Sequence, residues 1–585
     1  MKTTSFPQTL SILELKEKYK TGKLTPDNVI SDIIARTADD NEFNIWITPP
    51  SFELIQPYLD RLKKMDPEQK PLWGIPFAIK DNIDLADVPT TAGCAEYAFK
   101  PDEHATVVAR LIDAGAIPVG KTNLDQFATG LVGTRSPYGE TKNALNPELI
   151  SGGSSSGSAV SVARGLAAFA LGTDTAGSGR VPAGLNRLVG YKPSLGAWPV
   201  KGVVPACASL DCVTVFANTL ADAELVDQVA RGFEQMDPWS RTIERKANAM
   251  PEKIYLPQVA PSFFGSFSVE YQLAWDKAID RLKSLGITIE YLETSYLSEA
   301  AAILYDGPWV AERWADLGEF ISANEGVTFP VTEAVLRSGA KPEYDAPSIF
   351  KAIHKLQKLK SKAHSQLRNA VLVLPTSGGT WTRDEVRDNP IETNSKMGLY
   401  TNHCNLLDLC AVAVPSEDAA DHLPFGITLF SEFNNEHLIM GLADLFLNGT
   451  SASVKSDTTL VAVCGLHMRG FPLEQQMIEH GAQFIRESKT AEKYKLVKLP
   501  TAPVKPGLIR TFSSENGAAI ELELWEMPLS TFGTFVAGIP APLGIGKIEL
   551  EDGSFVPGFI CERSAAATAE DITKFGGWRG VFVSS

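Results

Sequence analysis

The sequence lacks a long apolar run, an excess of positive charge and a secretory leader, and each absence excludes a class of protein. No stretch approaches the roughly 18 consecutive apolar residues that a membrane-spanning helix needs. The N-terminal segment MKTTSFPQTLSILELKEKYK has charges among its apolar positions, unlike the apolar core of a signal peptide. The net charge of −16 argues against a nucleic-acid partner, because binding to phosphates depends on clustered Lys and Arg. We therefore expect a soluble protein with neither a membrane nor a nucleic acid as partner.

Cysteine is also scarce, and its distribution excludes two further kinds of protein. The seven cysteines are odd in number, scattered, and never in C-x-x-C spacing. This pattern predicts neither a disulfide framework nor a zinc site. It suits the reducing cytoplasm, where we expect the protein to work without a metal ion or cofactor.

The elements that the sequence does contain predict an α/β fold. Thr25 and Pro26 are typical of a helix cap followed by a first-turn proline. From about residue 70, strand-like runs such as GIPFAIKD and AIPVGKT alternate with helical stretches such as ATVVARLIDAG. Charged helical patterns fill residues 240–370, after which VLVLPTSGG and LCAVAVP are typical of buried strands.

A chain of 585 residues is too long for one compact core, so we expect at least two domains. The small and polar stretch NGTSASVKSDTT, residues 448–459, is the best candidate for a boundary. We predict a first domain over residues 1–450, a linker over 451–458 and a second domain over 459–585. In the second domain LVAVCGLHMRG, AAIELELWEMP and GSFVPGFICE resemble strands, which predicts a compact α+β domain.

The serine- and glycine-rich stretch LISGGSSSGSAV, residues 149–160, has three competing interpretations. A Walker phosphate loop is excluded because no lysine follows Gly157. A nucleophile elbow is formally present, with Ser155 between Gly153 and Gly157, and it needs a histidine from later in the chain. A flexible linker is disfavoured by the helix-like AVSVARGLAAFALGTDTAGSGR that follows, which ends in another Gly/Ser turn. The candidate histidines for the elbow are His403, His422 and His437, none in a convincing sequence context.

Upstream of this stretch, Lys80 in FAIKDN offers a different base. A serine can be activated without histidine or metal by a lysine that burial keeps neutral near pH 7. Lys80 follows the apolar run GIPFAI, so its side chain is a candidate for such burial. The alternative for a single lysine after a strand is an ordinary solvated charge.

The motifs KDN, GGSSSGSA and DTAGSGR, in this order, resemble the amidase signature family. The resemblance covers most of residues 70–220, including KTNLDQFATG and GYKPSLGAWPVKGVVP, and resumes in LYTNHCNLLDLCAVAVP. It implies an α/β fold with a central mixed sheet flanked by helices, and a Ser-Ser-Lys catalytic triad. In this sequence the implied nucleophile is Ser178, the bridging serine is Ser154 with a cis bond to Gly153, and the base is Lys80.

The implied triad assigns roles to the neighbouring residues as well. Ser154 would pass a proton between the nucleophile and Lys80. We expect Asp174 and Arg180 to brace the loop that carries Ser178. The remaining serines of the first motif are expected to be hydrogen-bonding scaffold, with Ser155 as an assisting residue; they are Ser155, Ser156 and Ser158. The candidate oxyanion-hole donors are the backbone amides of Thr175, Ala176, Gly177 and Ser178.

The segment ILYDGPWVAERW contains two candidate substrate-binding residues. Tyr305 and Arg313 are eight residues apart, so on one continuous helix they would face the same pocket, where the arginine could bind a carboxylate. The alternative is a solvated arginine and a core tyrosine. The segment resembles the substrate-recognition part of allophanate hydrolases, which act on a small ureido carboxylate. Gly130, in FATGLVG, is a further candidate for lining this pocket.

The C-terminal part, from VAVCGLHMRGFPLEQQM to APLGIGKIELEDGSFVPGFICE, resembles the domain that accompanies allophanate hydrolases and is similar to γ-glutamyl cyclotransferase-like folds. The resemblance implies that this domain promotes decarboxylation of the product of the first reaction. His467 is the candidate residue, with Arg469 beside it to form a cationic pair for a dianion. The alternative is a packed, hydrogen-bonded histidine.

Together these resemblances predict hydrolysis of the terminal amide of allophanate to ammonia and N-carboxycarbamate, in urea degradation. The implied functional partner is urea carboxylase, and a homodimer is the assembly considered. Three alternatives are an amidase for another small amide, the glutaminase-type subunit of a tRNA-dependent amidotransferase, and a non-catalytic scaffold. The acidic charge and the C-terminal domain disfavour the glutaminase-type protein, and the presence of Lys80, Ser154 and Ser178 together disfavours the scaffold.

Overall fold

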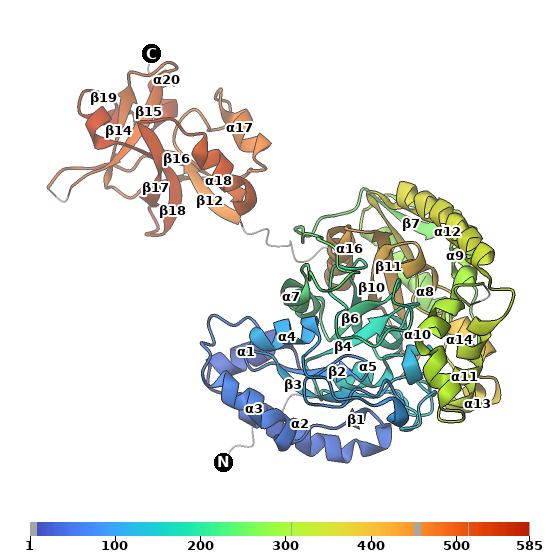
Figure 1. Ribbon diagram of the computed structural model, residues 1–585. Helices are drawn as coiled ribbons and strands as arrows, with labels where there is room; N and C mark the ends of the chain where they lie inside the picture. Colours follow the sequence, from blue (N-terminus) through green and yellow to red (C-terminus); the bar gives the residue numbers. More distant parts are fainter. Residues whose placement is uncertain (1–8, 306, 450–457, 513, 584–585) are drawn as a thin grey trace. The chain divides into compact units, whose positions relative to one another are not determined.

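The computed structural model describes residues 9–305, 307–449, 458–512 and 514–583. The chain divides into two compact units, Met1–Gly449 and Thr450–Ser585 (Figure 1). Residues 451–457 of the predicted linker lie outside the described residues, and its last residue, Thr458, begins a strand.

The first unit is built on a mixed sheet of 11 strands in the order β1-β3-β2-β4-β6-β5-β10-β11-β9-β7-β8. The pairs β2/β3, β2/β4, β7/β8 and β7/β9 are parallel and the other neighbours are antiparallel. The prediction of an α/β fold around a mixed sheet is therefore confirmed. The strands are β1 (Trp46–Thr48), β2 (Pro76–Lys80), β3 (Ile117–Thr122), β4 (Phe169–Asp174), β5 (Val189–Lys192), β6 (Cys212–Ala217), β7 (Lys253–Pro257), β8 (Ile289–Leu292), β9 (Ala370–Pro375), β10 (Leu409–Pro415) and β11 (Gly426–Glu432).

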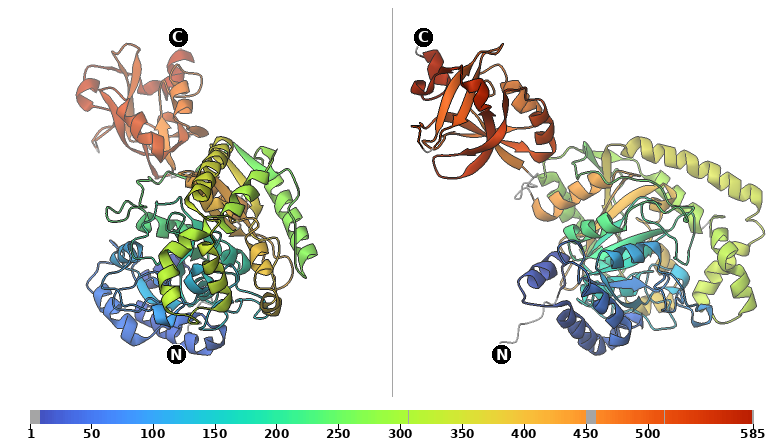
Figure 2. Two further views of the ribbon diagram at one scale, coloured as in Figure 1. Left: turned by 45° about the vertical axis from the view of Figure 1, so that its right-hand side comes forward. Right: turned by 60° about the vertical axis from the view of Figure 1, so that its left-hand side comes forward.

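Helices surround this sheet in both views of Figure 2. They are α1 (Ile12–Lys20), α2 (Pro26–Asp39), α3 (Phe52–Leu62), α4 (Thr106–Asp113), α5 (Ser156–Ala163), α6 (Val181–Leu185), α7 (Leu220–Ala230), α8 (Ser268–Ser284), α9 (Ser295–Tyr305), α10 (Val310–Ala323), α11 (Pro330–Arg337), α12 (Ala346–Leu367), α13 (Arg383–Asp388), α14 (Glu392–Met397), α15 (His403–Leu406) and α16 (Glu436–Asn448). The predicted cap is present at α2, where the Thr25 hydroxyl accepts the Asn28 amide and Pro26 occupies the first turn.

The apolar character of the central strands follows from burial on both faces. On β10, Leu409 and Ala411 pack with residues of α9, α12 and α15 in one cluster. The alternate residues Cys410, Val412 and Val414 pack with α7 and α16 in the other. Because successive side chains of a strand point to opposite faces, a strand covered on both sides is apolar throughout. This is why LCAVAVP shows no polar alternation.

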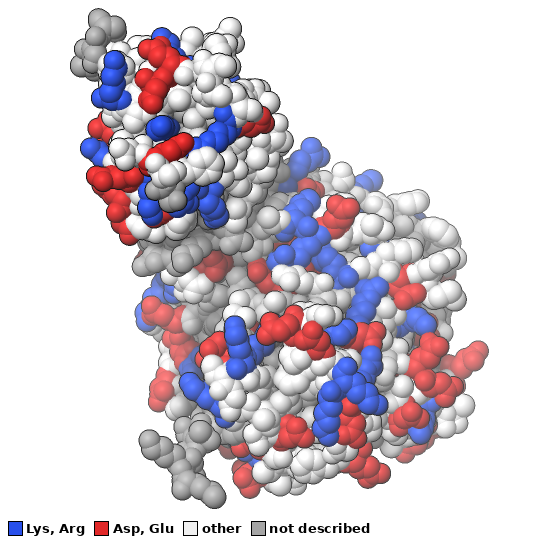
Figure 3. Space-filling view, turned by 90° about the vertical axis from the view of Figure 1, so that its left-hand side faces the viewer, with Lys and Arg blue, Asp and Glu red and all other residues white. Residues whose placement is uncertain are grey.

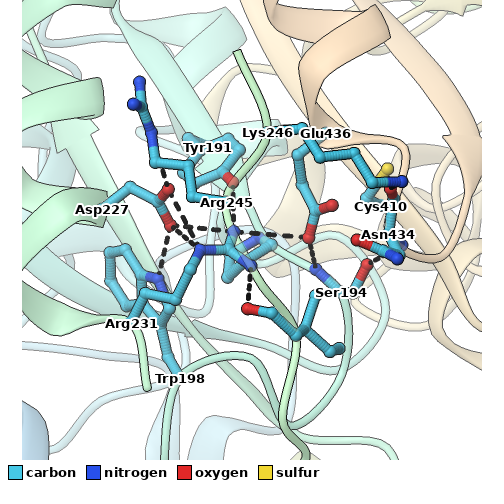
Figure 4. Close-up of polar contacts among 12 residues, drawn as sticks. Tyr191, Ser194, Trp198, Asp227, Arg231, Arg245, Lys246, Cys410, Asn434 and Glu436 are labelled. Atoms are coloured by element: carbon cyan, nitrogen blue, oxygen red, sulfur yellow. Dashed lines mark hydrogen bonds and ion pairs between the residues drawn. The ribbon is translucent and has the colours of Figure 1, made fainter. Parts of the chain in front are cut away.

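A buried ion cluster joins three of these elements (Figure 4). The guanidinium of Arg231, which follows α7, lies 3.0 Å from Asp227 and 3.3 Å from Glu436 at the start of α16. It also donates to the hydroxyl of Tyr191 on β5 at 2.9 Å, while Glu436 accepts the Ser194 amide at 3.0 Å. Because each buried charge has opposite charges or hydrogen-bond donors around it, the cluster links α7, β5 and α16 without leaving an uncompensated ion.

The second unit contains a five-stranded sheet, β13-β16-β12-β18-β17, and a three-stranded sheet, β15-β14-β19. The three strands expected from the sequence are present as β12, β16 and β18. The strands are β12 (Thr458–Val463), β13 (Gln483–Lys489), β14 (Tyr494–Leu499), β15 (Lys505–Arg510), β16 (Glu521–Pro528), β17 (Leu543–Glu549), β18 (Phe555–Cys561) and β19 (Glu570–Asp571). The helices are α17 (Glu474–Glu479), α18 (Leu529–Ala537), α19 (Arg563–Ala566) and α20 (Trp578–Val583).

The surface carries charges of both signs. On the face shown in Figure 3, Lys and Arg side chains are interspersed with Asp and Glu. Such mixing differs from the clustered basic surface that contacts a nucleic-acid backbone. Of the helices in the described ranges, none combines the length and the apolar character needed to cross a bilayer.

Candidate active site

Lys80 is the last residue of β2, and its side chain is completely buried, as the sequence predicted. Its Nζ lies 2.7 Å from Ser154 Oγ and 2.8 Å from Thr173 Oγ1. Burial lowers the pKa of Lys80 to about 7, although the negative charges of Asp125, Asp211 and Asp174 oppose the shift. A substantial fraction of the amine is therefore neutral at pH 7 and can accept a proton from Ser154.

Ser154 is joined to Gly153 by a cis peptide bond, as expected. Only glycine fits at position 153, because a Cβ atom there would lie 2.0 Å from a carboxylate oxygen of Asp125. That carboxylate is itself fixed, since it accepts the backbone amides of Val132, Gly133 and Arg135. The bend that presents Ser154 to Lys80 therefore packs directly on the loop that follows β3.

The other serines of this stretch form hydrogen bonds that hold α5 against the sheet. Ser155 Oγ donates to the Thr173 carbonyl at 3.1 Å and accepts the Thr173 amide at 3.3 Å. Ser158 Oγ donates to the Leu171 carbonyl, and Ser156 Oγ lies 3.0 Å from Thr141 Oγ1. The scaffold role predicted for them is confirmed. The described hydrogen bonds join none of the three candidate histidines to Ser155, so the nucleophile elbow finds no support.

The loop between β4 and α6 carries Ser178 and is held by hydrogen bonds to Asp174. The Asp174 carboxylate accepts the amides of Gly177 at 2.8 Å and Gly179 at 3.0 Å. Arg180 binds the same carboxylate through Nε at 2.9 Å and Nη2 at 3.0 Å, which confirms the bracing role of this pair. One prediction is corrected here: the Gly177 amide points to Asp174, so it is not an oxyanion-hole donor in this conformation.

Ser178 is 4% exposed, and its Oγ lies 3.5 Å from the carbonyl oxygen of Gly130. The structure therefore brings the implied nucleophile to the glycine that the sequence offered as a pocket residue. The described hydrogen bonds link Lys80 to Ser154 but do not include one between Ser154 and Ser178. The amides of Thr175, Ala176 and Ser178 stay candidates for the oxyanion hole.

Arg313 contacts Thr129, the residue before Gly130. It is 1% exposed, which excludes the solvated alternative, and its Nη1 donates to Thr129 Oγ1 at 2.8 Å. The premise of one continuous helix from Tyr305 to Arg313 is wrong: α9 ends at Tyr305 and α10 begins at Val310. The two residues therefore belong to different helices, and the side chain of Tyr305 lies outside the described residues.

Two buried residues of the site escaped the sequence reasoning. Thr173, on β4, is the second hydrogen-bond partner of the Lys80 amine, beside Ser154. Asp211 accepts the Thr175 hydroxyl, the Ala206 amide at 2.7 Å and the Cys207 amide. Burial raises the pKa of Asp211 to about 6, while its hydrogen bonds and Arg313 oppose the rise. Position on β4 beside DTAGSGR was a usable signal for Thr173, whereas nothing local marks Asp211.

A cavity of about 320 Å³ opens at Thr129 and Gly130. Its walls come from the loop after β3, from α9, α10 and the α11 region, and from residues 391–402. The cavity is large enough for a small amide. Gly130, one of its lining residues, is also the contact of Ser178 Oγ.

The second unit has its own cavity, of about 420 Å³, which His467 lines. The His467 ring stacks on Phe559 with centroids 4.8 Å apart, and its Nε2 lies 3.1 Å from Gln476 Oε1. Burial lowers the pKa of His467, which favours the neutral imidazole. The predicted cationic pair with Arg469 is wrong, because the Arg469 guanidinium binds Glu523 at 3.2 Å and Glu487 at 2.8 Å.

Comparison with known proteins places both units. Residues 28–440 match the family described as Amidase, and residues 459–582 match the allophanate hydrolase C-terminal domain. The chain is 41% identical over 578 residues to the urea amidolyase of Saccharomyces cerevisiae, covering 92% of this chain and 31% of that protein. It thus spans about a third of the length of this relative.

Two further relatives differ in how much of this chain they match. A solved allophanate hydrolase of Kluyveromyces lactis superposes with a TM-score of 0.73 at 37% identity, over 98% of this chain and 99% of that one. One subunit of the glutamyl-tRNA(Gln) amidotransferase of Lactobacillus acidophilus is 31% identical over 472 residues, 74% of this chain and 95% of that protein.

Proposed function

Because this chain belongs to the amidase family and is an amidohydrolase, we propose that its substrate is allophanate and that it acts in urea degradation. The observation that carries the proposal is the buried guanidinium of Arg313, which binds Thr129, the residue before the glycine whose carbonyl Ser178 Oγ contacts. A buried cation close to the scissile amide suits a substrate that carries a carboxylate. The allophanate hydrolase C-terminal domain, matched over residues 459–582, supports the same substrate.

The proposed reaction begins with attack of Ser178 Oγ on the terminal amide carbon. Its proton passes to Ser154 while Ser154 gives its own to the neutral Lys80, 2.7 Å away. The oxyanion is stabilised by the amides of Thr175, Ala176 and Ser178. Lys80 returns the proton through Ser154 to the departing nitrogen, which leaves as ammonia. Water then cleaves the acyl-enzyme by the same relay and releases N-carboxycarbamate.

For the second unit we propose that it speeds the loss of carbon dioxide from N-carboxycarbamate. In this step the C–N bond electrons return to nitrogen, one proton is added there, and carbamate and carbon dioxide leave. His467, held by Gln476 and Phe559, is the residue proposed to transfer that proton: its neutral ring takes a proton from solvent, and the imidazolium so formed gives that proton to the nitrogen. Urea carboxylase as functional partner, a cytoplasmic location and a homodimer belong to the same proposal.

The substrate proposal predicts faster ammonia release from allophanate than from glutamine, malonamide or simple aryl amides. We expect kcat/KM for allophanate to exceed the others by about 100-fold. Malonamide and simple aryl amides have no carboxylate for the buried cation. The carboxylate of glutamine lies three atoms from the amide carbon and beside an ammonium group, whereas that of allophanate lies one atom away. Coupled measurement of ammonia with each substrate tests this. Preference for glutamine would favour the glutaminase alternative, and preference for an uncharged amide would favour a general amidase.

The role proposed for the second unit predicts that the substitution His467→Ala affects the release of carbon dioxide but not the release of ammonia in the amide step. Ammonia release from the amide step should stay within about two-fold, while carbon dioxide release should slow by about 100-fold or more, the usual effect of losing a general acid. Parallel time courses of ammonia and carbon dioxide check this. The control His354→Ala removes an exposed histidine of the first unit and should change neither course. Equal rates in the His467 variant and the wild type contradict the assignment.

A further inference from the structure

A second buried arginine, Arg135, lines the cavity that opens at Thr129 and Gly130. It is 2% exposed and belongs to the loop after β3. It is also the only ionisable residue among the described residues that line this cavity; the others are apolar, glycine, serine, threonine or asparagine. Arg313 is not among the lining residues, although it binds the hydroxyl of Thr129. The charge at the wall of the cavity is therefore that of Arg135.

Contacts on both sides hold the Arg135 side chain in place. Its Nη1 donates to the Thr129 carbonyl at 3.1 Å, and its Nη2 donates to the Pro390 carbonyl at 2.6 Å. Its own backbone amide is fixed by Asp125 at 2.9 Å. The guanidinium thus bridges the loop after β3 and the segment before α14.

The two arginines converge on one residue. Arg313 donates to the hydroxyl of Thr129, and Arg135 donates to the carbonyl of the same residue. The next residue, Gly130, lies against the Arg135 side chain so closely that a Cβ would be 3.1 Å from its Cδ. Gly130 is also the contact of Ser178 Oγ, at 3.5 Å. Arg135 and Arg313 therefore both bind Thr129, the residue before the glycine that Ser178 contacts. The Asp125 carboxylate lies close to the same glycine, since a Cβ there would be 2.6 Å from its Oδ2.

We propose that Arg135 is a specificity-determining residue that favours amides bearing a carboxylate over neutral amides of the same shape. The inference rests on the proposed function and adds to it a second cation that acts from the cavity wall. A buried charge acts on a substrate ion more strongly than a solvated charge does. A neutral amide interacts with that charge only through its dipole and gains far less, so the effect discriminates by charge.

The test compares two substrates of the same shape, allophanate and biuret, in which an amide replaces the carboxylate. For Arg135→Met we expect kcat/KM for allophanate to fall by about 10- to 100-fold, mainly through KM, and that for biuret to change by less than about three-fold. For Arg135→Lys, which keeps the charge, the ratio of the two values should stay within about five-fold of the wild type. Equal losses on both substrates, or no loss on either, overturn the proposal.

Two controls separate this result from other causes. Arg110→Met removes an arginine that likewise donates to backbone carbonyls, those of Ala230, Gly232 and Phe233. This substitution should leave kcat/KM unchanged for both substrates. If Arg135→Met does not fold, loss of discrimination in Arg135→Lys contradicts the proposal by itself. If the wild type does not hydrolyse allophanate, the proposed function fails. Arg135 is then tested on the anionic and neutral members of whichever amide pair the wild type accepts.

Discussion

Replacement of Ser178 by alanine is expected to reduce ammonia release by at least about 10⁴-fold, because the covalent route is lost with the nucleophile. The fold should persist. Within the described residues, the one hydrogen bond of Ser178 Oγ is a long contact of 3.5 Å to the Gly130 carbonyl, so the substitution breaks no strong hydrogen bond there. Steady-state ammonia release, together with the unfolding temperature of the variant, measures both expectations. A Ser178→Ala enzyme with substantial activity would show that the nucleophile has been misassigned.

Ser155→Ala is the matched control, because Ser155 is the most motif-like serine of the chain. Its hydroxyl bonds both the amide and the carbonyl of Thr173. We expect this variant to lose about 1–3 kcal/mol of stability, since a buried hydrogen-bonded group is removed, and to keep most of its activity per folded molecule. The reverse outcome, an inactive but stable Ser155→Ala beside an active Ser178→Ala, favours the nucleophile elbow.

Substitution of Lys80 by methionine is expected to slow ammonia release by about 10³- to 10⁴-fold. The reason is that no other base contacts Ser154 in the described structure. The wild type should show the complementary pH dependence. Burial lowers the pKa of Lys80 to about 7, and only the neutral amine can accept a proton. kcat/KM should therefore rise about ten-fold per pH unit below 7 and level off above it.

Asp211 provides the control for this pH profile, because burial raises its pKa to about 6. Its carboxylate accepts the Thr175 hydroxyl, so we expect protonation of Asp211 to lower activity further at acidic pH and to add a second inflection near pH 6. In Asp211→Asn the overall rate should fall, but the inflection near pH 7 should persist if Lys80 causes it. Loss of that inflection in Asp211→Asn would assign it to Asp211 instead.

The sequence by itself determined the features that depend on neighbouring residues. Alternating strand and helix patterns predicted the α/β fold, because side-chain periodicity is set by local backbone geometry. Contiguous motifs, together with the family resemblance, located Lys80, the cis bond before Ser154 and the bracing pair of Asp174 and Arg180. Each of these is readable because the residues involved stand at fixed positions within short motifs.

Only the tertiary structure decided which distant groups meet. It separated Tyr305 from Arg313 by a helix break and paired Arg469 with Glu523 and Glu487 in place of His467. It also brought Arg135 and Arg313, which are far apart in the chain, to the two sides of Thr129. Such partners are set by packing between segments that are distant in the chain. An unpaired charge is costly to bury, so the fold is stable only where each buried charge lies near an opposite charge or a hydrogen-bond partner. No local sequence pattern shows which residues will be the partners of these charged side chains.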